Sequence, residues 1–306
     1  MLKVRGTQVA VAVALAISSF VVQADGGFYG SIRIGAQYSD PGGDADAEIV
    51  LRSWASRMGF SGSTDLDNGL NAFGKYEFGV DVRSGGNGNG ALSTRHAYVG
   101  LKGGFGTITL GQTYHTWYNT VIGPVDQPWW GACNGCIAYT GRSSDGVSYA
   151  GTFGNIGVGA TAYLAPTDGA DEAEDLDGLE VGVTFDAAGL KIGLGMQDLE
   201  GSETVVGASV TGSAGAIGYA ANVTSQGGAN GADDSTGVDV FLSYGNAYID
   251  VGVIDSGDQS TGFTLGYTKS IGNATTSWFE LSSFDSGVDG ADASMTARAA
   301  LKYDWQ

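Results

Sequence analysis

The sequence has few basic residues, since Lys and Arg number 14 against 33 Asp and Glu and the net charge is −19. Nucleic-acid binding relies on Lys and Arg that neutralise phosphates, so this composition excludes nucleic acid as an obvious partner. Histidine is also scarce, with His96 and His115 alone in the chain. Nucleophilic catalysis needs a nucleophile, a base and a group that orients the base, and two isolated histidines form a poor set. We therefore do not expect an enzyme.

The sequence also lacks an apolar run long enough for a transmembrane helix. Its most apolar stretch, VAVALAISSFVV, follows Lys3 and Arg5 and ends close to Ala24. A spanning helix needs about 20 apolar residues, so the pattern favours a secretory signal peptide over 1–24, and a membrane anchor is the alternative. Its removal would leave one domain over 25–306 with 12 basic and 33 acidic residues, a net charge near −21.

Glycine is what the chain has in excess, at 53 of 306 residues, where about 7% is usual. The glycines follow no G-X-Y order and are mixed with alternating apolar residues, which indicates many curved β-strands. In the segment 71–83, Tyr76, Phe78 and Val80 alternate with Lys75 and Glu77. An apolar face backed by a charged face is typical of a strand with lipid on one side and a wet lumen on the other.

The rest of the chain repeats this alternation of apolar and polar residues. Segments of about ten alternating residues are joined by connections that are alternately short, such as DAAG and YGN, and long and acidic, such as PTDGADEAEDLDG. Lipid offers backbone groups no hydrogen-bond partners, so a membrane protein made of strands must close into a barrel. The fold prediction is all-β, a transmembrane antiparallel β-barrel of about 16 strands.

The longest segment without alternation is 114–141, which contains the motif PVDQPWW and both cysteines. Loops longer than about 15 residues are usually functional, and we interpret this one as folded into the barrel. Its tryptophans are interpreted as packing that pins the loop, with a sugar-stacking platform as the alternative. Cys133 and Cys136 flank Asn134-Gly135, and an oxidising compartment favours a disulfide between them. A metal site would need two further ligands, so none is predicted.

Strand parity gives further expectations for individual side chains. In the strand 49–61, Trp54 shares a face with Met58 and is expected in the outer aromatic girdle, while Arg57 points into the lumen. Arg52 has the parity of Trp54 and is expected at the outer rim. In the strand 94–102, Arg95 is expected to point inward and His96 outward.

Several motifs together resemble those of the trimeric Gram-negative general porins. They are SRMGF at 56–60, STDLDNGL at 63–70, TRHAYVGLK at 94–102, FGTITLGQ at 105–112 and the pair Gly141-Arg142. The resemblance implies an outer-membrane homotrimer whose pores pass ions and small hydrophilic solutes without a cofactor. Two features depart from the family pattern, because Gln306 follows Trp305 at the C-terminus and the third long loop carries a Cys-x-x-Cys pair.

The resemblance also implies a set of pore residues. The third extracellular loop would narrow the pore, and a ladder of wall arginines would face a loop carboxylate. The implied constriction residues are Arg57, Arg95, Arg142, Glu77 and Asp126, and Arg33, Lys75 and Arg83 are possible lining residues. The alternatives are a structural or adhesive outer-membrane barrel and a solute-specific channel.

Charge in the long loops bears on partners and on ion selectivity. The cluster Asp168, Asp171, Glu172, Glu174, Asp175 and Asp177 is either a solvated surface or a site for divalent cations that bridge lipopolysaccharide phosphates. The wall arginines favour anions, whereas the loop acids attract cations to the pore mouth. The Debye length is about 30 Å at 0.01 M salt and about 3 Å at 1 M, so we expect a weak cation preference in dilute salt that fades as salt rises.

Overall fold

A computed structural model describes residues 25–82, 92–164, 176–228 and 233–305. The predicted signal peptide, Arg83, and all of the acidic cluster except Asp177 lie outside these residues. Among the described residues, no helix is both long and apolar enough to cross a membrane.

The described chain is almost entirely β-structure. The strands are β1 (Asp25–Asp40), β2 (Glu48–Ser53), β3 (Arg57–Asp65), β4 (Asn71–Val80), β5 (Leu92–Gly103), β6 (Gly106–Tyr114), β7 (Arg142–Ser143), β8 (Gly146–Phe153), β9 (Ile156–Tyr163), β10 (Gly178–Ala187), β11 (Leu190–Leu199), β12 (Val205–Ala214), β13 (Ile217–Gln226), β14 (Ser235–Tyr244), β15 (Ala247–Asp255), β16 (Gln259–Ser270), β17 (Thr275–Asp285) and β18 (Ser294–Trp305). Two short helical turns, η1 (Asp67–Gly69) and η2 (Tyr118–Ile122), interrupt them.

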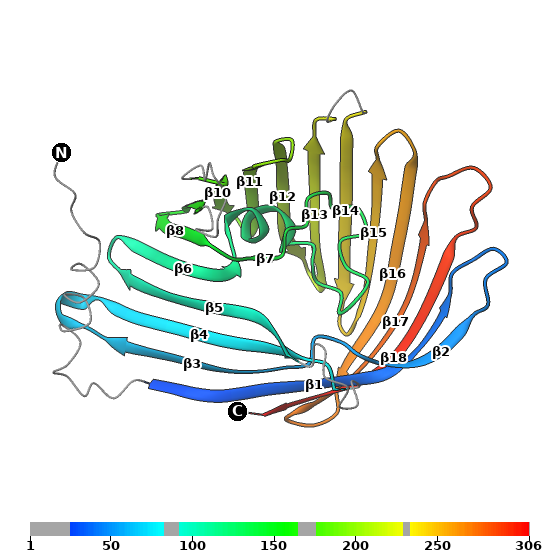
Figure 1. Cartoon of the computed structure of the whole chain (residues 1–306), viewed down its shortest axis with the longest axis horizontal. Coiled ribbons are helices and arrows are strands. Elements are labelled where there is room, and N and C mark those ends of the chain that lie inside the picture. Colours follow the sequence, from blue (N-terminus) through cyan, green and yellow to red (C-terminus); the bar gives the residue numbers. More distant parts are fainter. Residues whose placement is uncertain (1–24, 83–91, 165–175, 229–232, 306) are drawn as a thin grey trace, which may run out of the picture.

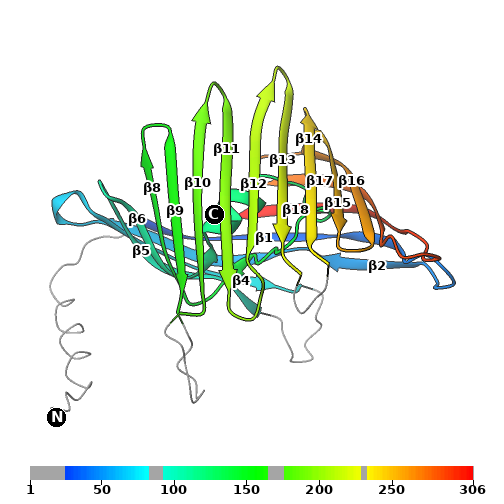
Figure 2. The same ribbon diagram turned by 90° about the horizontal axis from the view of Figure 1, so that it is seen from above.

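These strands close into one antiparallel barrel. β1 pairs with β18 on one side and with both β2 and β3 on the other, and each remaining strand pairs with its neighbours in sequence. β2 and β3 are two pieces of one strand, as are β7 and β8, so the described barrel has 16 strands and the fold prediction is confirmed. In Figures 1 and 2 the strands β1 to β6 cross the direction of β10 to β16 on the opposite wall.

The wall has its polarity inverted relative to a soluble protein. In β14, Val238 and Val240 are 43% and 37% exposed on the outer surface, while Asp239 between them is fully buried. The closing strand β18 shows the predicted pattern, because Leu301 and Tyr303 are exposed outside and Arg298 is buried inside. Such a wall is stable where lipid covers the apolar face and polar groups find partners within the barrel.

The turn between β3 and β4 contains the dipeptide Asn68-Gly69, which favours a tight hairpin. Asn68 and Gly69 both have positive φ, at 66° and 74°, as a type I′ turn requires. The Leu66 N–H donates to the Leu70 carbonyl at 2.8 Å and closes the turn.

The expectation that Trp54 lies in the outer girdle is wrong. Trp54 is 1% exposed and packs inside against Trp278, with ring centroids 4.8 Å apart. The cause is the break between β2 and β3, where Ala55 has φ of 50° and interrupts the alternation. Arg57 therefore points inward as predicted, and Arg52 shares the inward face of Trp54 opposite Gly35 instead of lying at the outer rim.

The expectation that His96 faces outward is also wrong. The pairing of β4 with β5 shifts register between Glu77 and Phe78, so Arg95 is an extra residue in a β-bulge. A bulge lets two successive side chains point to the same face. His96 is consequently buried beside Arg95 on the inner face, where its Nδ1 lies 3.2 Å from Thr113 Oγ1.

Candidate functional site

The connection between β6 and β7, residues 115–141, runs through the barrel interior and is called the inner loop below (Figure 1). Its helical turn η2 packs on the inner faces of β10 to β13. Trp117, directly before this turn, and Val121 and Ile122 within it are fully buried and form an apolar cluster with Val205 of β12. The first part of the inner loop is thus fixed to the wall by packing.

Tryptophans fix the middle of the inner loop. Trp129 packs on Trp278 of β17 with ring centroids 4.9 Å apart, and Trp130 meets Trp54 at 6.1 Å. Trp130 remains exposed on its other side. The contacts of Trp117 and Trp129 confirm the prediction that tryptophans pack the loop in place.

Two buried glutamates bind the inner loop through its backbone. Glu180 of β10 accepts a hydrogen bond from the Trp117 N–H at 2.8 Å and another from the Tyr163 hydroxyl at 2.8 Å. Glu280 of β17 accepts from the Trp129 N–H at 2.8 Å. Hydrogen bonds to charged groups contribute about 1.5–3 kcal/mol each, so these carboxylates are strong attachment points.

The tip of the inner loop is closed by a disulfide between Cys133 and Cys136, the pairing expected from the sequence, with Cα atoms 5.0 Å apart. The two residues between the cysteines both contact the wall. The side-chain amide of Asn134 donates to Asp250 of β15 at 2.5 Å. The backbone N–H of Gly135 donates to Asp239 of β14 at 2.6 Å.

Wall glycines leave room for this tip of the inner loop. Gly237 of β14 and Gly252 of β15 face the inside, and a Cβ at either position would collide with the backbone of Gly135. Gly262 of β16 leaves room for the side chain of Asn134 in the same way. The close approach of two backbones requires glycine here.

Four wall acids hold the inner loop and were not predicted from the sequence, namely Glu180, Asp239, Asp250 and Glu280. A signal for them was available. Each is an acid with an apolar residue on either side along its strand, as in the segments LEV, VDV, IDV and FEL. Their buried carboxylates accept hydrogen bonds from the inner loop, which lies between them and the open lumen.

The basic side of the lumen centres on Glu77 of β4, which is buried. Arg95 Nε lies 2.8 Å from its Oε1, Arg57 Nη1 lies 3.7 Å from the same atom, and Lys75 Nζ lies 3.3 Å from its Oε2. The Tyr29 hydroxyl also donates to Glu77 at 2.8 Å. The structure therefore brings together Arg57, Arg95, Glu77 and Lys75, with three cations around one carboxylate.

Arg142 and Asp126 lie away from this centre. The guanidinium of Arg142 stacks on Tyr114 at 4.7 Å and donates to its hydroxyl. Asp126 accepts hydrogen bonds from Tyr118 at 2.7 Å and Tyr139 at 2.6 Å. Tyr114 stacks on Tyr118 with centroids 3.8 Å apart, so a tyrosine cluster separates the two charges.

The tyrosines of this cluster stay protonated. Burial raises the pKa of Tyr118 and the pKa of Tyr139, and the neighbouring Asp126 carboxylate raises both further. Burial also lowers the pKa of His115, so its imidazole is neutral at pH 7, with Nε2 3.1 Å from the Ser143 carbonyl oxygen.

Further cations line the wall next to the inner loop. The guanidinium of Arg33 lies over the ring of Trp129 at 4.9 Å, and Lys302 Nζ lies 5.4 Å from the same ring. Arg298 of β18 lies 3.8 Å from Glu280. Neither Arg298 nor Lys302 was among the pore residues implied by the sequence.

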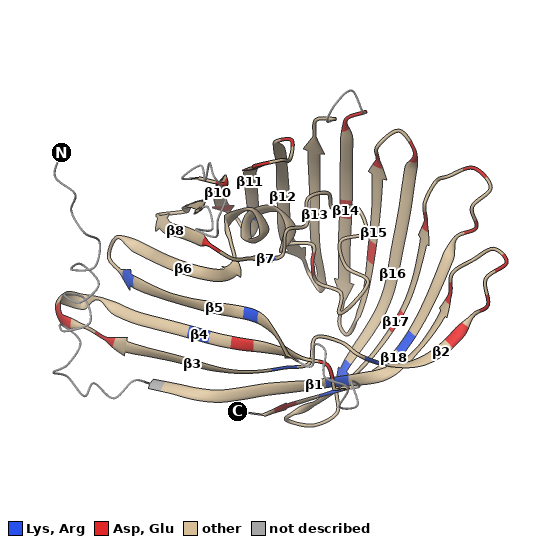
Figure 3. Cartoon of the chain, viewed as in Figure 1, with Lys and Arg blue, Asp and Glu red and all other residues tan. Residues whose placement is uncertain are grey.

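The inner wall is thus divided by charge. Figure 3 shows basic residues on β1, β3, β4, β5 and β18, with an acidic residue among them on β4, and acidic residues on β14, β15 and β17. The inner loop binds to the acidic part, so the remaining lumen is bounded by the basic part. In the ranges that the structure describes, His, Cys, Asp and Glu side chains form no group of three that could hold a metal ion.

The chain matches a known family over nearly its whole length. A family model described as Gram-negative porin matches residues 10–305. The major outer membrane protein P.IB of Neisseria gonorrhoeae is 33% identical over 117 residues, which is 36% of this chain and 33% of that relative. The match thus spans about a third of the length of the curated relative.

Solved structures with the same architecture include two outer-membrane proteins. OmpF of Salmonella typhi, solved in complex with daunomycin, has a TM-score of 0.73 at 14% identity and covers 92% of this chain and 97% of its own. An anion-selective porin from Comamonas acidovorans has a TM-score of 0.71 at 17% identity, with 92% and 100% covered. At these identities the likeness extends to the fold alone.

We predict that Cys133 and Cys136 are disulfide-bonded in the mature protein. Alkylation in denaturant should label neither thiol before reduction and both after reduction, as read by mass spectrometry. Closing a four-residue ring should stabilise the folded protein by about 2 kcal/mol on the chain-entropy estimate, so the double variant with Cys133→Ser and Cys136→Ser should unfold more easily by that amount. Two freely alkylated thiols in unreduced protein would contradict this prediction.

Proposed function

Because this chain belongs to the Gram-negative porin family, we propose that it forms a diffusion pore in the outer membrane. Ions and small hydrophilic solutes pass down their gradients through a water-filled lumen. The proposal includes no cofactor, no energy coupling and no catalytic step.

The arrangement of ion pairs carries this proposal. Across residues 25–82, 92–164, 176–228 and 233–305, every ion pair joins residues on one strand or on two adjacent strands. A purely structural barrel would be expected to carry salt bridges across its interior. The described interior instead leaves a polar cavity of about 680 Å³ beside Arg57, Lys75 and Glu77, which supports a pore over a structural or adhesive role.

The constriction is proposed to lie between the inner loop and the basic wall. Arg57, Arg95 and Glu77 form its wall side, and Asp126 with its two tyrosines forms its loop side. Rings of charged side chains in a narrow pore impose electrostatic selectivity. Arginine suits this role because it stays charged beside other cations, and Arg142 extends the positive charge toward the tyrosine cluster.

A general pore is favoured over a solute-specific channel by the use of the aromatic residues. Trp117 and Trp129 pack against the wall, and the hydroxyls of Tyr118 and Tyr139 donate hydrogen bonds to Asp126. The rings form two separate groups, the tyrosine cluster and the tryptophans around Trp278, and no ring contact joins the two groups among the described residues.

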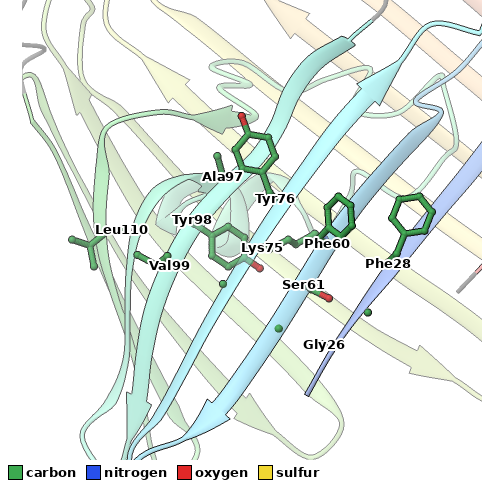
Figure 4. Close-up of a pocket in the computed structure, with 13 residues that line it drawn as sticks. Gly26, Phe28, Phe60, Ser61, Lys75, Tyr76, Ala97, Tyr98, Val99 and Leu110 are labelled. Carbon is green, nitrogen blue, oxygen red and sulfur yellow. The ribbon is translucent and has the colours of Figure 1, made fainter. Parts of the chain in front are cut away.

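A homotrimer is proposed from the outer surface. An apolar hollow of about 840 Å³ lies on the outer face of β1, β3, β4, β5 and β6. Glycines at 26, 62 and 74 form its floor, and Figure 4 shows the rings of Phe28, Phe60 and Tyr76 beside it. Side chains of a second copy would fill this hollow. At the long-loop end we propose contacts with lipopolysaccharide, with Asp177 among the acids that divalent cations would bridge to phosphate.

Neutralising the three wall arginines tests the constriction. The triple variant Arg57→Gln, Arg95→Gln and Arg142→Gln should shift permeability toward cations and raise the conductance, because it removes positive charge and bulk. A charge about 7 Å from an ion changes its energy by about 0.6 kcal/mol in a water-like dielectric, roughly threefold in permeability for each arginine. Reversal potentials in KCl gradients across a planar bilayer measure this, at low and at high salt.

The matched control for this experiment is Lys269→Gln, which removes a cation from the outer face of β16. Its selectivity should stay that of the wild type. If the triple variant and the control have the same reversal potential and conductance, the arginines do not lie at the constriction.

The oligomeric state tests the proposed interface. Native mass spectrometry of the detergent-solubilised protein should give the mass of three copies. Phe60→Lys, inside the hollow, should yield single copies that keep a β-sheet circular dichroism spectrum, while Phe185→Lys on the outer face of β10 should leave the trimer intact. A wild type that is monomeric, or a trimer unaffected by Phe60→Lys, would rule out this surface.

A further inference from the structure

A basic pocket opens into the lumen at the end where the short turns lie. It is a cavity of about 680 Å³ bounded by β1, β3, β4 and β18 and by the turn between β16 and β17. Its charged lining consists of Arg33, Arg57, Lys75, Lys302, Glu77 and Asp304. Trp129 of the inner loop packs on two of these cations, Arg33 and Lys302, so the pocket lies next to the constriction and on one side of it.

The lining carries two more positive than negative charges. Glu77 is shared by Arg57, Lys75 and also Arg95. Asp304 is engaged by Lys302, with Nζ 2.8 Å from its Oδ2. The acids of the pocket are therefore already occupied by cations and leave an excess positive charge that no described side chain balances.

Arg33 is the cation with the least compensation. Among the described residues it makes no ion pair, and its buried Nε atom has no hydrogen-bond partner. The face of its guanidinium rests on Trp129, so the donors at the guanidinium edge remain available. A partly desolvated guanidinium without an acceptor is costly, and a carboxylate or phosphate of a solute would satisfy it.

Lys302 provides a second cation beside Arg33. The two residues are direct partners across the β1–β18 pairing and lie on the same face of the sheet. The planar fork of arginine binds a carboxylate or phosphate through two parallel hydrogen bonds, while lysine acts as a point charge. A cavity of this volume falls within the range of small-molecule sites, about 300–1,000 Å³.

We propose that the basic pocket is a binding subsite for small organic dianions, namely dicarboxylates or phosphate monoesters. One anionic group binds Arg33 and the other lies near Lys302 and Arg57, which neutralises the excess charge of the lining. This assignment rests on the proposed pore function, because a solute reaches the pocket through the lumen. A dianion held there occupies the ion path and reduces the current carried by KCl.

Single-channel recording in a planar bilayer tests the subsite. Sodium succinate and glycerol 3-phosphate are the two dianionic probes, and succinamide is a neutral probe of the same length as succinate. Block is expressed relative to each channel's own KCl conductance. Saturable block is expected with at least one dianion and not with succinamide, and the two arms show whether the pocket takes carboxylates, phosphates or both.

Substitutions locate the block. Arg33→Gln and Lys302→Gln should each raise the half-blocking concentration by about fivefold or more, the effect of losing one charge-assisted hydrogen bond. Lys302→Arg keeps the charge and should stay within about twofold of the wild type, and Lys269→Gln should not differ from it. Heat-modified migration on gels confirms that each variant is folded.

The possible results separate this proposal from the pore itself. A wild type without KCl conductance would refute the proposed pore function. A conducting wild type that neither dianion blocks saturably, or block of equal strength in the wild type, Arg33→Gln and Lys302→Gln, would overturn the subsite and leave the pore function standing.

Discussion

The structure depends on one constraint, which is that lipid offers no hydrogen-bond partner to the peptide backbone. Every strand must then pair on both edges, and β1 meets that demand by pairing with β18 as well as with β2 and β3. Closure forces the strands to alternate, with apolar side chains outside and polar ones inside. The buried Asp239 between the exposed Val238 and Val240 follows directly from this rule.

The same constraint applies inside the barrel, where the inner loop has backbone groups that need acceptors. Wall carboxylates supply them, since Glu180 and Glu280 accept from the backbone of Trp117 and Trp129 and Asp239 accepts from Gly135. Using acids for this attachment has an electrical consequence. The acids of one wall lie beneath the loop and accept its hydrogen bonds. Arg57, Lys75 and Arg95 on the opposite wall face the lumen. The mechanical attachment of the loop and the charge of the pore are therefore two results of one arrangement.

The sequence was sufficient for features governed by a regular period. The alternation predicted about 16 strands and the inward direction of Arg57 and Glu77. It failed where one residue breaks the period, because a bulge at Arg95 or a positive φ at Ala55 leaves no mark in a hydrophobic pattern. The same strand break placed Trp54 inside instead of outside. The wall partners of the inner loop could not be predicted either, since the contact between Asp250 and Asn134 joins residues far apart in sequence. The tyrosine cluster between Asp126 and Arg142 likewise could not be predicted from the spacing of residues.

The central claim is that the inner loop covers the acidic wall and leaves Arg57, Lys75 and Arg95 of the basic wall facing the lumen. Cysteine accessibility measures this directly in the reconstituted protein with its native disulfide intact. Lys75→Cys on the basic wall should react readily with a cationic methanethiosulfonate reagent and change the current. Thr224→Cys lies at a fully buried position of β13 beside the acidic strand β14, where Thr224 contacts the Ile137 N–H of the loop, and it should react far more slowly. Equal modification rates at the two positions would mean that the loop does not lie on the acidic wall.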